Sequence, residues 1–378
     1  MIKPLILRVG YLVVPDRNTW LRKQFEKSGS SYIKIGQFIS SRSDVFGKEL
    51  SDEMSKLQDS VEPVKWDMIK HHVDTSKFTD VDTNPLASAS VAQIHRAKYK
   101  DKDVVLKIKK PNVDKSLKRD ISNIRACLSM FPFLESNKAL PWVEEIDRTI
   151  DKELDFRNEI INLKKFREMY QWDDSVVIPK VYPSVSTENM IVMEYVPSDK
   201  TIFKSERLID MFVEQILFEG VIHGDLHGGN IGFSGENLVM YDFGNIIYIS
   251  KEYQDAMKEF IMALQMKDVD KTIDAMIKMG MVVRSIEGTR IFIQKFFKYL
   301  DTLDITSFKF SADEIIDKVP VEIDSTTFTI LRSFSLLEGL CKKKDQTFRY
   351  EDIFLKNLEM LMISEICSNN GQMLRNFL

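Results

Sequence analysis

The chain has few cysteines and no closely spaced pair of them. Among its 378 residues there are three, Cys127, Cys341 and Cys367, with no CxxC pair and no histidine at metal-ligand spacing. Disulfide-stapled secreted domains and zinc modules carry their cysteines in close, regular sets. The three are therefore expected to be reduced thiols. The chain is expected in a cytosol-like compartment, cytoplasmic or on the matrix side of an organelle, and not to be secreted.

Long apolar runs are also missing. No stretch of about 18 apolar residues without charge occurs, so a membrane-spanning helix is not expected. The opening MIKPLILRVGYLVVP is apolar but short, carries Lys3 and Arg8, and lacks a small-residue cleavage site. Two readings stay open for it: a surface anchor, or the more frequent case of a docked terminal strand or helix. A peripheral contact with a membrane surface is thus an open alternative.

No sign of charge dominates the composition. Lys and Arg number 53 and Asp and Glu 57, which gives a formal net charge of −4. This balance, with 10% aromatic residues, indicates a globular protein and gives no polybasic surface for nucleic acid. The length favours two lobes and an appendage over a single core. The sequence gives no oligomeric state.

Helical periodicity is typical of the first 84 residues. In LSDEMSKLQDSVEP, for example, Leu50, Met54 and Leu57 fall on one face of a helix. Near residue 85 the pattern changes, because NPLASASVAQIHRAKYKDKDVVLKIKK contains two β-rich runs around a KDKD turn. Residues 1–84 are therefore predicted to form a helical extension.

The remainder is predicted to form two lobes. Residues 85–196 are expected to be a small β-rich lobe, with inserted helices between Trp142 and Tyr170 and a hairpin-like pair of strands in VYPSVSTENMIVMEYV. After Pro197 the pattern is helical, with one polar loop and two short strands near its start. Residues 197–378 are therefore predicted to be a helical lobe.

Two short polar segments carry the chemistry. Residues 223–230 read HGDLHGGN, and residues 241–245 read YDFGN. An aspartate five residues ahead of an asparagine, followed by a strand and Asp-Phe-Gly, is typical of phosphoryl-transfer sites. Asp225 can accept or orient the proton of an attacking hydroxyl. The amide oxygen of Asn230 and the carboxylate of Asp242 are hard oxygen ligands that suit Mg²⁺.

The two histidines of this loop need a separate interpretation. His223 and His227 are four residues apart, a spacing that suits a metal pair on a helix. The interleaved glycines indicate a loop instead. His223 is expected to organise the backbone, and the role of His227 stays open.

A phosphate-contacting lysine is expected on the third strand of the small lobe. VVLKI offers Lys107. Alternation places Val105 and Lys107 on one face of that strand and Leu106 and Ile108 on the other, so Lys107 faces the site if the opposite face is covered. The phosphate loop expected upstream is ordinarily rich in glycine. Here it reads ASASVAQIH and contains none.

Several of these segments occur together in a fixed order: YIKIGQFISSR, MSKLQDSVEP, PLASASVAQIHRA, VVLKIKKPNV, ELDFRNEIINLKKF, GVIHGDLHGGNI and the DFG. In this, the chain from roughly residue 20 to residue 250 resembles the UbiB family of atypical kinases, whose members support ubiquinone and other prenyl-lipid metabolism. The resemblance implies an α+β, protein-kinase-like fold of two lobes with an N-terminal helical KxGQ extension.

The resemblance also implies roles for residues outside the loop. Lys34 and Gln37 match the KxGQ motif, which in the family folds over the place where a protein substrate would lie. Glu153 and Asp155 match the ExD motif. In this reading the four are regulatory, and Lys34 is expected to lie opposite Glu153.

For catalysis the resemblance implies Lys107, Asp225 and the helix residue Glu159, which would pair with Lys107. Asn230 and Asp242 match the metal ligands. The alanine-rich loop and the hinge strand ending in MEYV supply the other nucleotide contacts. The expected set is Ala87, Ser88, Ala89, Ser90, Lys107, Glu194 and Val196. Ser88 stands where the family has a run of alanines, which bears on nucleotide preference.

Two classes of function follow, both with ATP and Mg²⁺. One is an ATPase or a kinase of a small, lipid-related molecule, which the complete set of catalytic residue types favours. The other is a nucleotide-gated, pseudokinase-like module that binds an isoprenoid lipid with little catalysis. A third reading, an aminoglycoside-type phosphotransferase, rests on HGDLHGGN alone and explains neither KIGQ nor ASAS.

Overall fold

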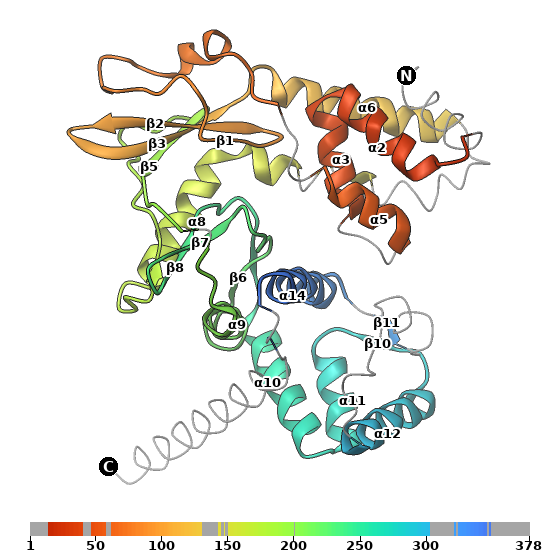
Figure 1. Ribbon diagram of the computed structural model, residues 1–378. Helices are drawn as coiled ribbons and strands as arrows, with labels where there is room; N and C mark the ends of the chain where they lie inside the picture. The colour runs from red at the N-terminus through yellow and green to blue at the C-terminus, as the bar shows by residue number, and fades with distance from the viewer. Residues whose placement is uncertain are drawn as a thin grey trace. The chain divides into compact units, whose positions relative to one another are not determined.

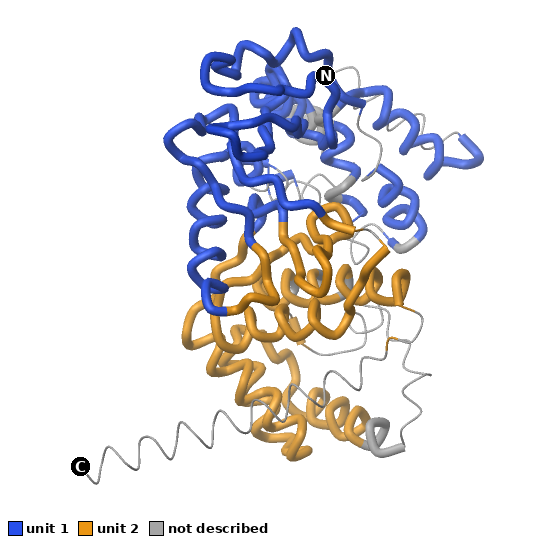
Figure 2. Tube along the Cα trace, turned by 60° about the vertical axis from the view of Figure 1, so that its left-hand side comes forward, with its two compact units in different colours: residues 1–172, 178–197, 241–245 blue, residues 173–177, 198–240, 246–378 orange. Residues whose placement is uncertain are grey.

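The computed structural model describes most of the chain as two compact units. The described residues are 14–40, 47–57, 62–130, 143–144, 147, 150–199, 201–302, 321–322, 324–345 and 348. Figure 2 colours unit 1 blue and unit 2 orange. Unit 1 comprises residues 1–172, 178–197 and 241–245, and unit 2 comprises residues 173–177, 198–240 and 246–378. The short segment 241–245 therefore belongs to unit 1, although the chain on both sides of it belongs to unit 2.

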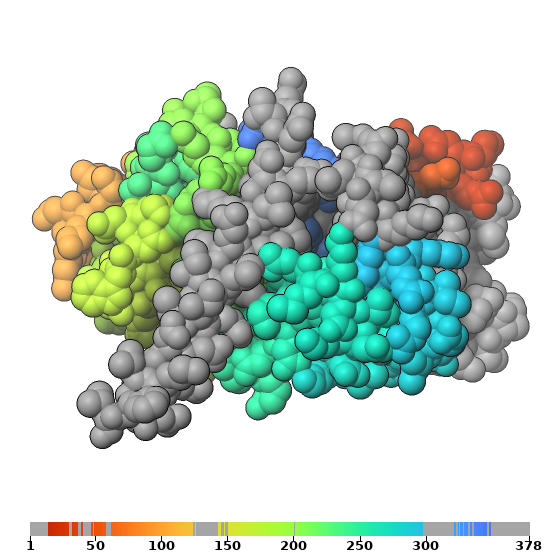
Figure 3. Space-filling model, turned by 90° about the horizontal axis from the view of Figure 1, so that it is seen from below, coloured from red at the N-terminus to blue at the C-terminus, as the bar shows by residue number. Residues whose placement is uncertain are grey.

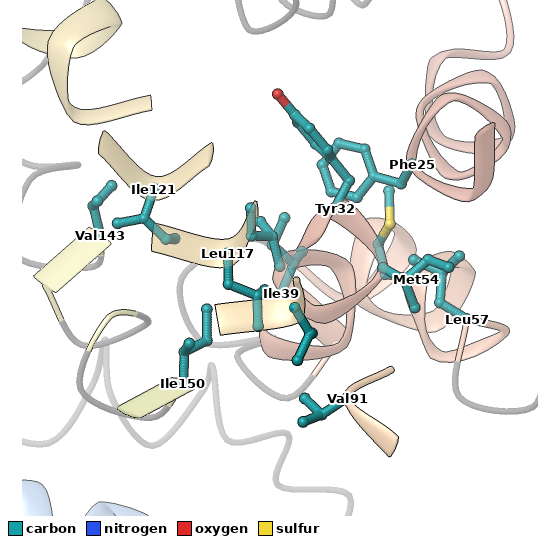
Figure 4. Packing of buried hydrophobic residues seen from close by; sticks show 13 residues of the cluster. Phe25, Tyr32, Ile39, Met54, Leu57, Val91, Leu117, Ile121, Val143 and Ile150 are labelled. Carbon is teal, nitrogen blue, oxygen red and sulfur yellow. The ribbon is translucent and has the colours of Figure 1, made fainter. Parts of the chain in front are cut away.

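The first part of unit 1 is helical. Its helices are α2 (Arg17–Ser28), α3 (Ser30–Ser40) and α5 (Lys48–Ser55), and they contact one another (Figure 1). Asp16 caps α2, since its side chain accepts a hydrogen bond from the Thr19 amide. The three helices share one apolar cluster, in which Met54 and Leu57 are fully buried, as their spacing predicts (Figure 4).

Close packing of α3 against α5 depends on Gly36. A Cβ atom added at this position would lie 2.2 Å from Leu57 Cδ1 and 3.0 Å from the Phe25 ring. The same cluster includes Val91, which directly follows the alanine-rich segment, and Leu117 of α6 (Val113–Met130). The extension therefore shares its core with the rest of unit 1.

The prediction that helix continues to residue 84 is wrong for the described residues 62–84. This stretch contains two short 3-10 turns, η1 (Trp66–Met68) and η2 (Lys70–His72), and then bends and turns. The physical reason is local. Pro63 disfavours helix, and the carboxylates of Asp74 and Asp82 accept hydrogen bonds from the backbone amides two residues on, those of Ser76 and Asn84.

The sheet of unit 1 is antiparallel, with strand order β1-β2-β3-β5. Its strands are β1 (Ala87–Ser88), β2 (Ala92–Tyr99), β3 (Lys102–Lys109) and β5 (Met190–Glu194). A two-residue turn joins β2 to β3, and both of its residues, Lys100 and Asp101, have positive φ. Ile69 and Phe78 cover one face of β3. Lys107 is therefore left on the other face, as predicted.

The predicted pair of strands in residues 181–196 is formed only in its second half, β5. The first half is reduced to isolated bridges, among them Val181 to Met193. Pro183 lacks an amide proton, and the Ser186 hydroxyl, rather than a strand carbonyl, accepts the Val192 amide at 2.9 Å.

The helix that packs on β5 is α8 (Phe156–Met169). Asp155 interrupts the predicted helical run and caps α8, because its carboxylate accepts hydrogen bonds from the amides of Arg157 and Asn158.

The first helix of unit 2 is α9 (Ser205–Glu214), which continues into a π-helical turn, η4 (Gln215–Glu219), that Gly220 ends with positive φ. The functional loop follows. The strands of this unit are β4 (Val176–Val177), β6 (Val221–His223), β7 (Ile231–Ser234), β8 (Asn237–Met240), β9 (Ile246–Tyr248), β10 (Val282–Val283) and β11 (Val321–Glu322). Its further helices are α10 (Lys251–Gln265), α11 (Val269–Lys278), α12 (Ile286–Thr302) and α14 (Ser325–Lys344), and in Figure 3 the surfaces of α10 to α12 run together.

Candidate functional site

A lysine between two carboxylates forms the centre of the candidate site in unit 1. Lys107 Nζ on β3 lies 2.6 Å from Glu159 Oε1 on α8 and 3.0 Å from Asp242 Oδ2 in segment 241–245. The structure thus brings Lys107 together with two residues that lie 52 and 135 positions after it along the chain. The pairing of Lys107 with Glu159, expected from the resemblance, is confirmed.

Burial sets the electrostatics of this cluster. The side chains of Lys107 and Glu159 are 12% and 2% exposed, whereas that of Asp242 is 39% exposed. Burial raises the pKa of Glu159 to about 7, against the attraction of Lys107, and the Asp242 charge adds to the rise. Burial alone would lower the pKa of Lys107, but the two carboxylates raise it, so this lysine stays charged. One cation therefore serves two carboxylates, of which only Asp242 has access to solvent.

The DFG segment is held from both sides. The Gly244 amide donates to Asp242 Oδ1 at 2.9 Å, and a Cβ at Gly244 would lie 3.2 Å from that oxygen. Phe243 is fully buried and packs edge-on against Phe166 of α8 at 5.2 Å between ring centroids. Asn162, also on α8, donates its amide to the Phe243 carbonyl at 2.9 Å. Asp242 is thereby fixed next to Lys107.

Sequence reasoning missed Asn162 and Phe166. Both lie on the buried face of α8 that carries Glu159, at i+3 and i+7 from it. That spacing was the available signal, because residues on the same helix face as Glu159 are expected to contact the same neighbouring segments.

The alanine-rich segment forms the edge of the sheet. Ala87 and Ser88 make up β1, and the Ala89 amide donates to the Ala92 carbonyl across a tight turn. Ser90 is buried. The Ser88 hydroxyl is buried without a hydrogen-bond partner. A buried hydroxyl in that state is costly unless a ligand satisfies it, so this loop fits an acceptor such as a phosphate oxygen.

The two predicted hinge residues lie at and after the end of β5. The Glu194 carboxylate accepts the Lys180 amide at 3.1 Å, and Glu194 pairs with Val104 of β3. The Val196 carbonyl accepts a hydrogen bond from the Tyr241 hydroxyl at 3.2 Å. The hinge segment is thus tied to the segment that carries Asp242.

The regulatory residues of the extension are also in contact. Lys34 of α3 forms an ion pair with Glu153, and the two side chains are 15% and 20% exposed. Asp155 does not join this pair; it caps α8. Gln37 lies on α3, and its side chain is outside the described residues. The contact between Lys34 and Glu153 is therefore confirmed, and its regulatory role stays a prediction.

In unit 2 the segment HGDLHGGN forms a loop after β6, as predicted. Asn230 is tied to Asp225, because its side-chain amide donates to the Asp225 carbonyl at 3.0 Å. That bond leaves the amide oxygen of Asn230 as its remaining hard ligand atom, which fits Mg²⁺. His227 accepts the Gly229 amide at its Nδ1 atom, 3.0 Å away, and its Nε2 atom lies 3.8 Å from the Asp225 carboxylate. His227 thus stabilises the turn locally.

His223 organises the backbone of this loop. It is buried, and its Nδ1 atom accepts the Asp225 amide at 3.2 Å. Its own amide donates to the side chain of Gln215 at 2.9 Å. Gln215 lies on the π-helical turn η4 and was not predicted from the sequence, because only a polar residue in an otherwise apolar run marks it.

No helix in the described residues is long and apolar enough to cross a membrane.

Known proteins similar to the chain include kinase-like ones. A family model described as "ABC1 atypical kinase-like domain" matches residues 56–276. The Arabidopsis thaliana protein named "Protein ACTIVITY OF BC1 COMPLEX KINASE 8, chloroplastic" is 30% identical over 301 residues, 72% of this chain and 40% of that protein. A "Probable protein kinase UbiB" from Histophilus somni is 32% identical over 240 residues, 56% of this chain and 44% of that protein. The chain spans less than half the length of these two curated relatives.

A solved structure is similar over most of the chain. It is titled "The complex structure of Rv3197-erythromycin from Mycobacterium tuberculosis", with a TM-score of 0.53 and 20% identity. The match covers 81% of this chain and 86% of that chain. At this identity the likeness concerns the fold alone.

Proposed function

The chain belongs to the ABC1 atypical kinase-like family and has a kinase-like fold of mixed helices and sheets, and from this premise we propose that it is an ATP-dependent atypical kinase or ATPase that uses Mg²⁺. The observation that carries the proposal is Lys107, a buried cation held between Glu159 and Asp242. A purely structural role would favour one carboxylate for one cation. The second, solvent-accessible carboxylate suits a site that takes up a further cation.

Each residue of the cluster, and each further residue expected from the sequence motifs, has a proposed task. Lys107 neutralises phosphate charge, and Glu159 keeps its ammonium in place. Asp242 and Asn230 supply oxygen ligands for Mg²⁺, which lends positive charge to the phosphates when it is bound. Asp225 accepts or orients the proton of the attacking hydroxyl or water. Ser88 donates its unpartnered hydroxyl to the nucleotide.

The substrate class is proposed from the relatives. Their names include UbiB and ACTIVITY OF BC1 COMPLEX KINASE, and we propose a small, isoprenoid-lipid-linked substrate of the ubiquinone type. The chloroplastic names of two Arabidopsis relatives agree with placement in an organelle. A cytoplasmic location and a peripheral contact with a membrane surface remain part of the proposal.

A second candidate is a nucleotide-gated lipid-binding module with little turnover. The ion pair between Lys34 and Glu153 favours it, because a pinned extension suits a protein that opens and closes around a ligand. ATP turnover by the purified protein, measured with and without liposomes and prenyl-lipid analogues, separates the two. The enzyme proposal requires turnover that these additions raise, and nucleotide binding without turnover would favour the module.

The metal site is tested by Asp242→Asn, which keeps the size of the side chain and removes its charge. The affinity for Mg²⁺-ATP should fall by about tenfold or more, and the thermal stabilisation that Mg²⁺-ATP gives should fall with it. Asp101→Asn is the matched control, since Asp101 is in an exposed turn at positive φ, which asparagine tolerates. Equal stabilisation of both variants by Mg²⁺-ATP would show that Asp242 is not a metal ligand.

A further inference from the structure

A chain of buried polar groups runs through unit 1 behind the alanine-rich segment. Gln93 and His95, both on β2, are fully buried. Gln93 Oε1 accepts the Val64 amide at 2.9 Å, and Gln93 Nε2 donates to the Val64 carbonyl at 3.2 Å. The same nitrogen lies 2.8 Å from His95 Nε2, and His95 Nδ1 lies 2.8 Å from the Asp82 carbonyl. This row of hydrogen-bonded groups therefore connects Val64 to Asp82 through two side chains.

The hydrogen-bond partners of Gln93 and His95 determine where each proton of these two side chains lies. The Asp82 carbonyl only accepts, so His95 Nδ1 must carry a proton. The two protons of Gln93 Nε2 are then used by the Val64 carbonyl and by His95 Nε2, which must accept. His95 is thus satisfied only as the neutral ring protonated on Nδ1. A flipped Gln93 amide would place its nitrogen against the Val64 amide and its oxygen against the Val64 carbonyl, so rotation of Gln93 does not offer an alternative.

The same residues connect two segments of unit 1. The main chain of Gln93 pairs with Ser88 of the alanine-rich segment, and its side chain holds Val64, in the linker that follows the helical extension. Lys110 adds a second hold on that linker, since its buried ammonium donates to the Glu62 carbonyl at 3.1 Å. Val91, two residues before Gln93, packs in the core of the extension (Figure 4).

We propose that Gln93 and His95 are positioning residues that couple the helical extension to the alanine-rich segment, and that protonation of His95 releases this coupling. The coupling between the extension and the alanine-rich segment does not depend on a bound ligand. The effect of this coupling on nucleotide affinity rests on the proposed function.

Protonation of His95 would place an N–H group against the Gln93 amide N–H, with no acceptor between them. The charged group that acts on His95 is the Asp82 carboxylate, which favours protonation. Trp66 of η1, Gln93, and Leu106 opposite on β3 carry no charge. Burial outweighs Asp82 and lowers the pKa of His95 below its ordinary value of 6.5. The folded state therefore binds fewer protons than the unfolded state, and the coupling weakens as the pH falls below about 6.5.

Hydrogen exchange of the Val64 amide tests the coupling directly, because that amide donates to Gln93. Exchange is measured at pH 7.5 and 5.5 on the full chain and corrected for the intrinsic rate. In the parent, protection should fall by up to about tenfold at the lower pH, since the opened state takes up a proton on His95 at its ordinary pKa of 6.5 and the buried donor then loses its partner. His95→Gln keeps an acceptor and a donor but cannot titrate, so its protection should be similar at both values. Gln93→Met should lack protection at both.

His71→Gln is the matched control, because His71 is an exposed histidine in the neighbouring η2. It should behave as the parent does. Equal protection of Val64 in the parent at both values, or the same loss at low pH in His95→Gln as in the parent, would overturn the proposal.

Titration with Mg²⁺-ADP separates this proposal from the proposed function. At pH 7.5 the affinity of Gln93→Met should differ from that of the parent by at least about threefold, whereas His71→Gln should match the parent. An unchanged affinity in Gln93→Met would contradict the coupling to the nucleotide loop. If the parent itself binds neither Mg²⁺-ADP nor Mg²⁺-ATP, the proposed function is wrong. Exchange at residues 86–90 then decides the coupling, and no change there in Gln93→Met would overturn it.

Discussion

Lys107 and Lys34 of unit 1 both contact carboxylates, and the two contacts differ in the burial and in the number of those carboxylates. Lys107 serves a glutamate that is almost completely buried and an aspartate that is partly exposed. Within the described part of the chain, Lys34 forms an ion pair with one carboxylate, that of Glu153, and both side chains keep some access to solvent. The first contact lies between a strand and a helix of the kinase-like core, and the second joins the extension to the residues just before α8.

The difference separates a permanent charge cluster from a reversible latch. Removing one member of a deeply buried cluster leaves the other charges without compensation, at a cost of about 3 to 5 kcal/mol. A pair that water can reach contributes less, about 1 kcal/mol or below, because solvent replaces the lost partner. We therefore expect the Lys107 cluster to persist through ligand exchange and the Lys34 pair to open and close.

The largest effect is expected for Lys107→Met, which leaves two carboxylates facing each other. The free energy of unfolding should fall by about 3 kcal/mol or more, as measured by urea denaturation, and binding of Mg²⁺-ATP should be lost. Lys102→Met, at the exposed start of the same strand, should match the parent in both measurements. Equal stability of the two variants would mean that the cluster is as weak as the latch.

Glu159→Gln should change how stability depends on pH. Because the pKa of Glu159 is raised to about 7, the folded state binds more protons than the unfolded state between pH 4.5 and 7, so this group makes stability fall as the pH rises through that window. Its contribution amounts to roughly 3 kcal/mol at most. The substitution should flatten that slope, and Glu168→Gln, on the exposed face of α8, should not. Denaturation curves at pH 5, 6 and 7 give the comparison.

Packing rather than charge should dominate the extension. In Gly36→Ala the new methyl group would overlap the Leu57 side chain, so the stability of the extension should fall by about 1 to 3 kcal/mol. Gly339→Ala is the control, since a Cβ there meets nothing within 4 Å and alanine favours helix. Protease cleavage within residues 20–57 should accelerate in the first variant and not in the second.

The smallest effect is expected for the latch. Lys34→Ala and Glu153→Gln should each destabilise by about 1 kcal/mol or less, and the double variant should be no worse than either single one, because all three lose one interaction. Lys23→Ala, an exposed lysine on α2, is the control. The extension should be cleaved faster in the latch variants, and self-phosphorylation absent from the parent is the expected accompanying change. Additive effects would show that Lys34 and Glu153 act separately.

Local pattern explains which parts of the fold could be predicted. Alternation in VVLKI places Lys107 on the open face of β3, and helical spacing along residues 50–57 places Met54 and Leu57 in the core. Order along the chain, together with the family resemblance, identifies Glu159 and Asp242. Each of these signals is contained within a few residues or in a motif of fixed spacing.

The remainder depends on contacts between distant segments. Nothing near Gln93 indicates that its amide would hold Val64, 29 positions away, and nothing near Asn162 indicates the Phe243 carbonyl, 81 positions away. Asp155 reads as part of a charged motif, yet its carboxylate caps a helix, since the sequence does not show where that helix begins. The predicted hairpin in 181–196 fails because a serine side chain replaces a strand partner.

Because residues 241–245 belong to unit 1, the Lys107 cluster can be completed only late in synthesis of the chain. Lys107 and Glu159 leave the ribosome 52 positions apart, but Asp242 follows Lys107 by 135. At about 5 to 20 residues per second, roughly 7 to 27 s pass between the synthesis of the lysine and that of its second partner. Once Glu159 has been made, and until Asp242 and Phe243 follow, the nascent chain holds a two-member charge pair and an open place for Phe243. We expect ribosome-bound chains that stop before residue 241 to bind chaperones, and chains that extend well beyond residue 245 to be released from them.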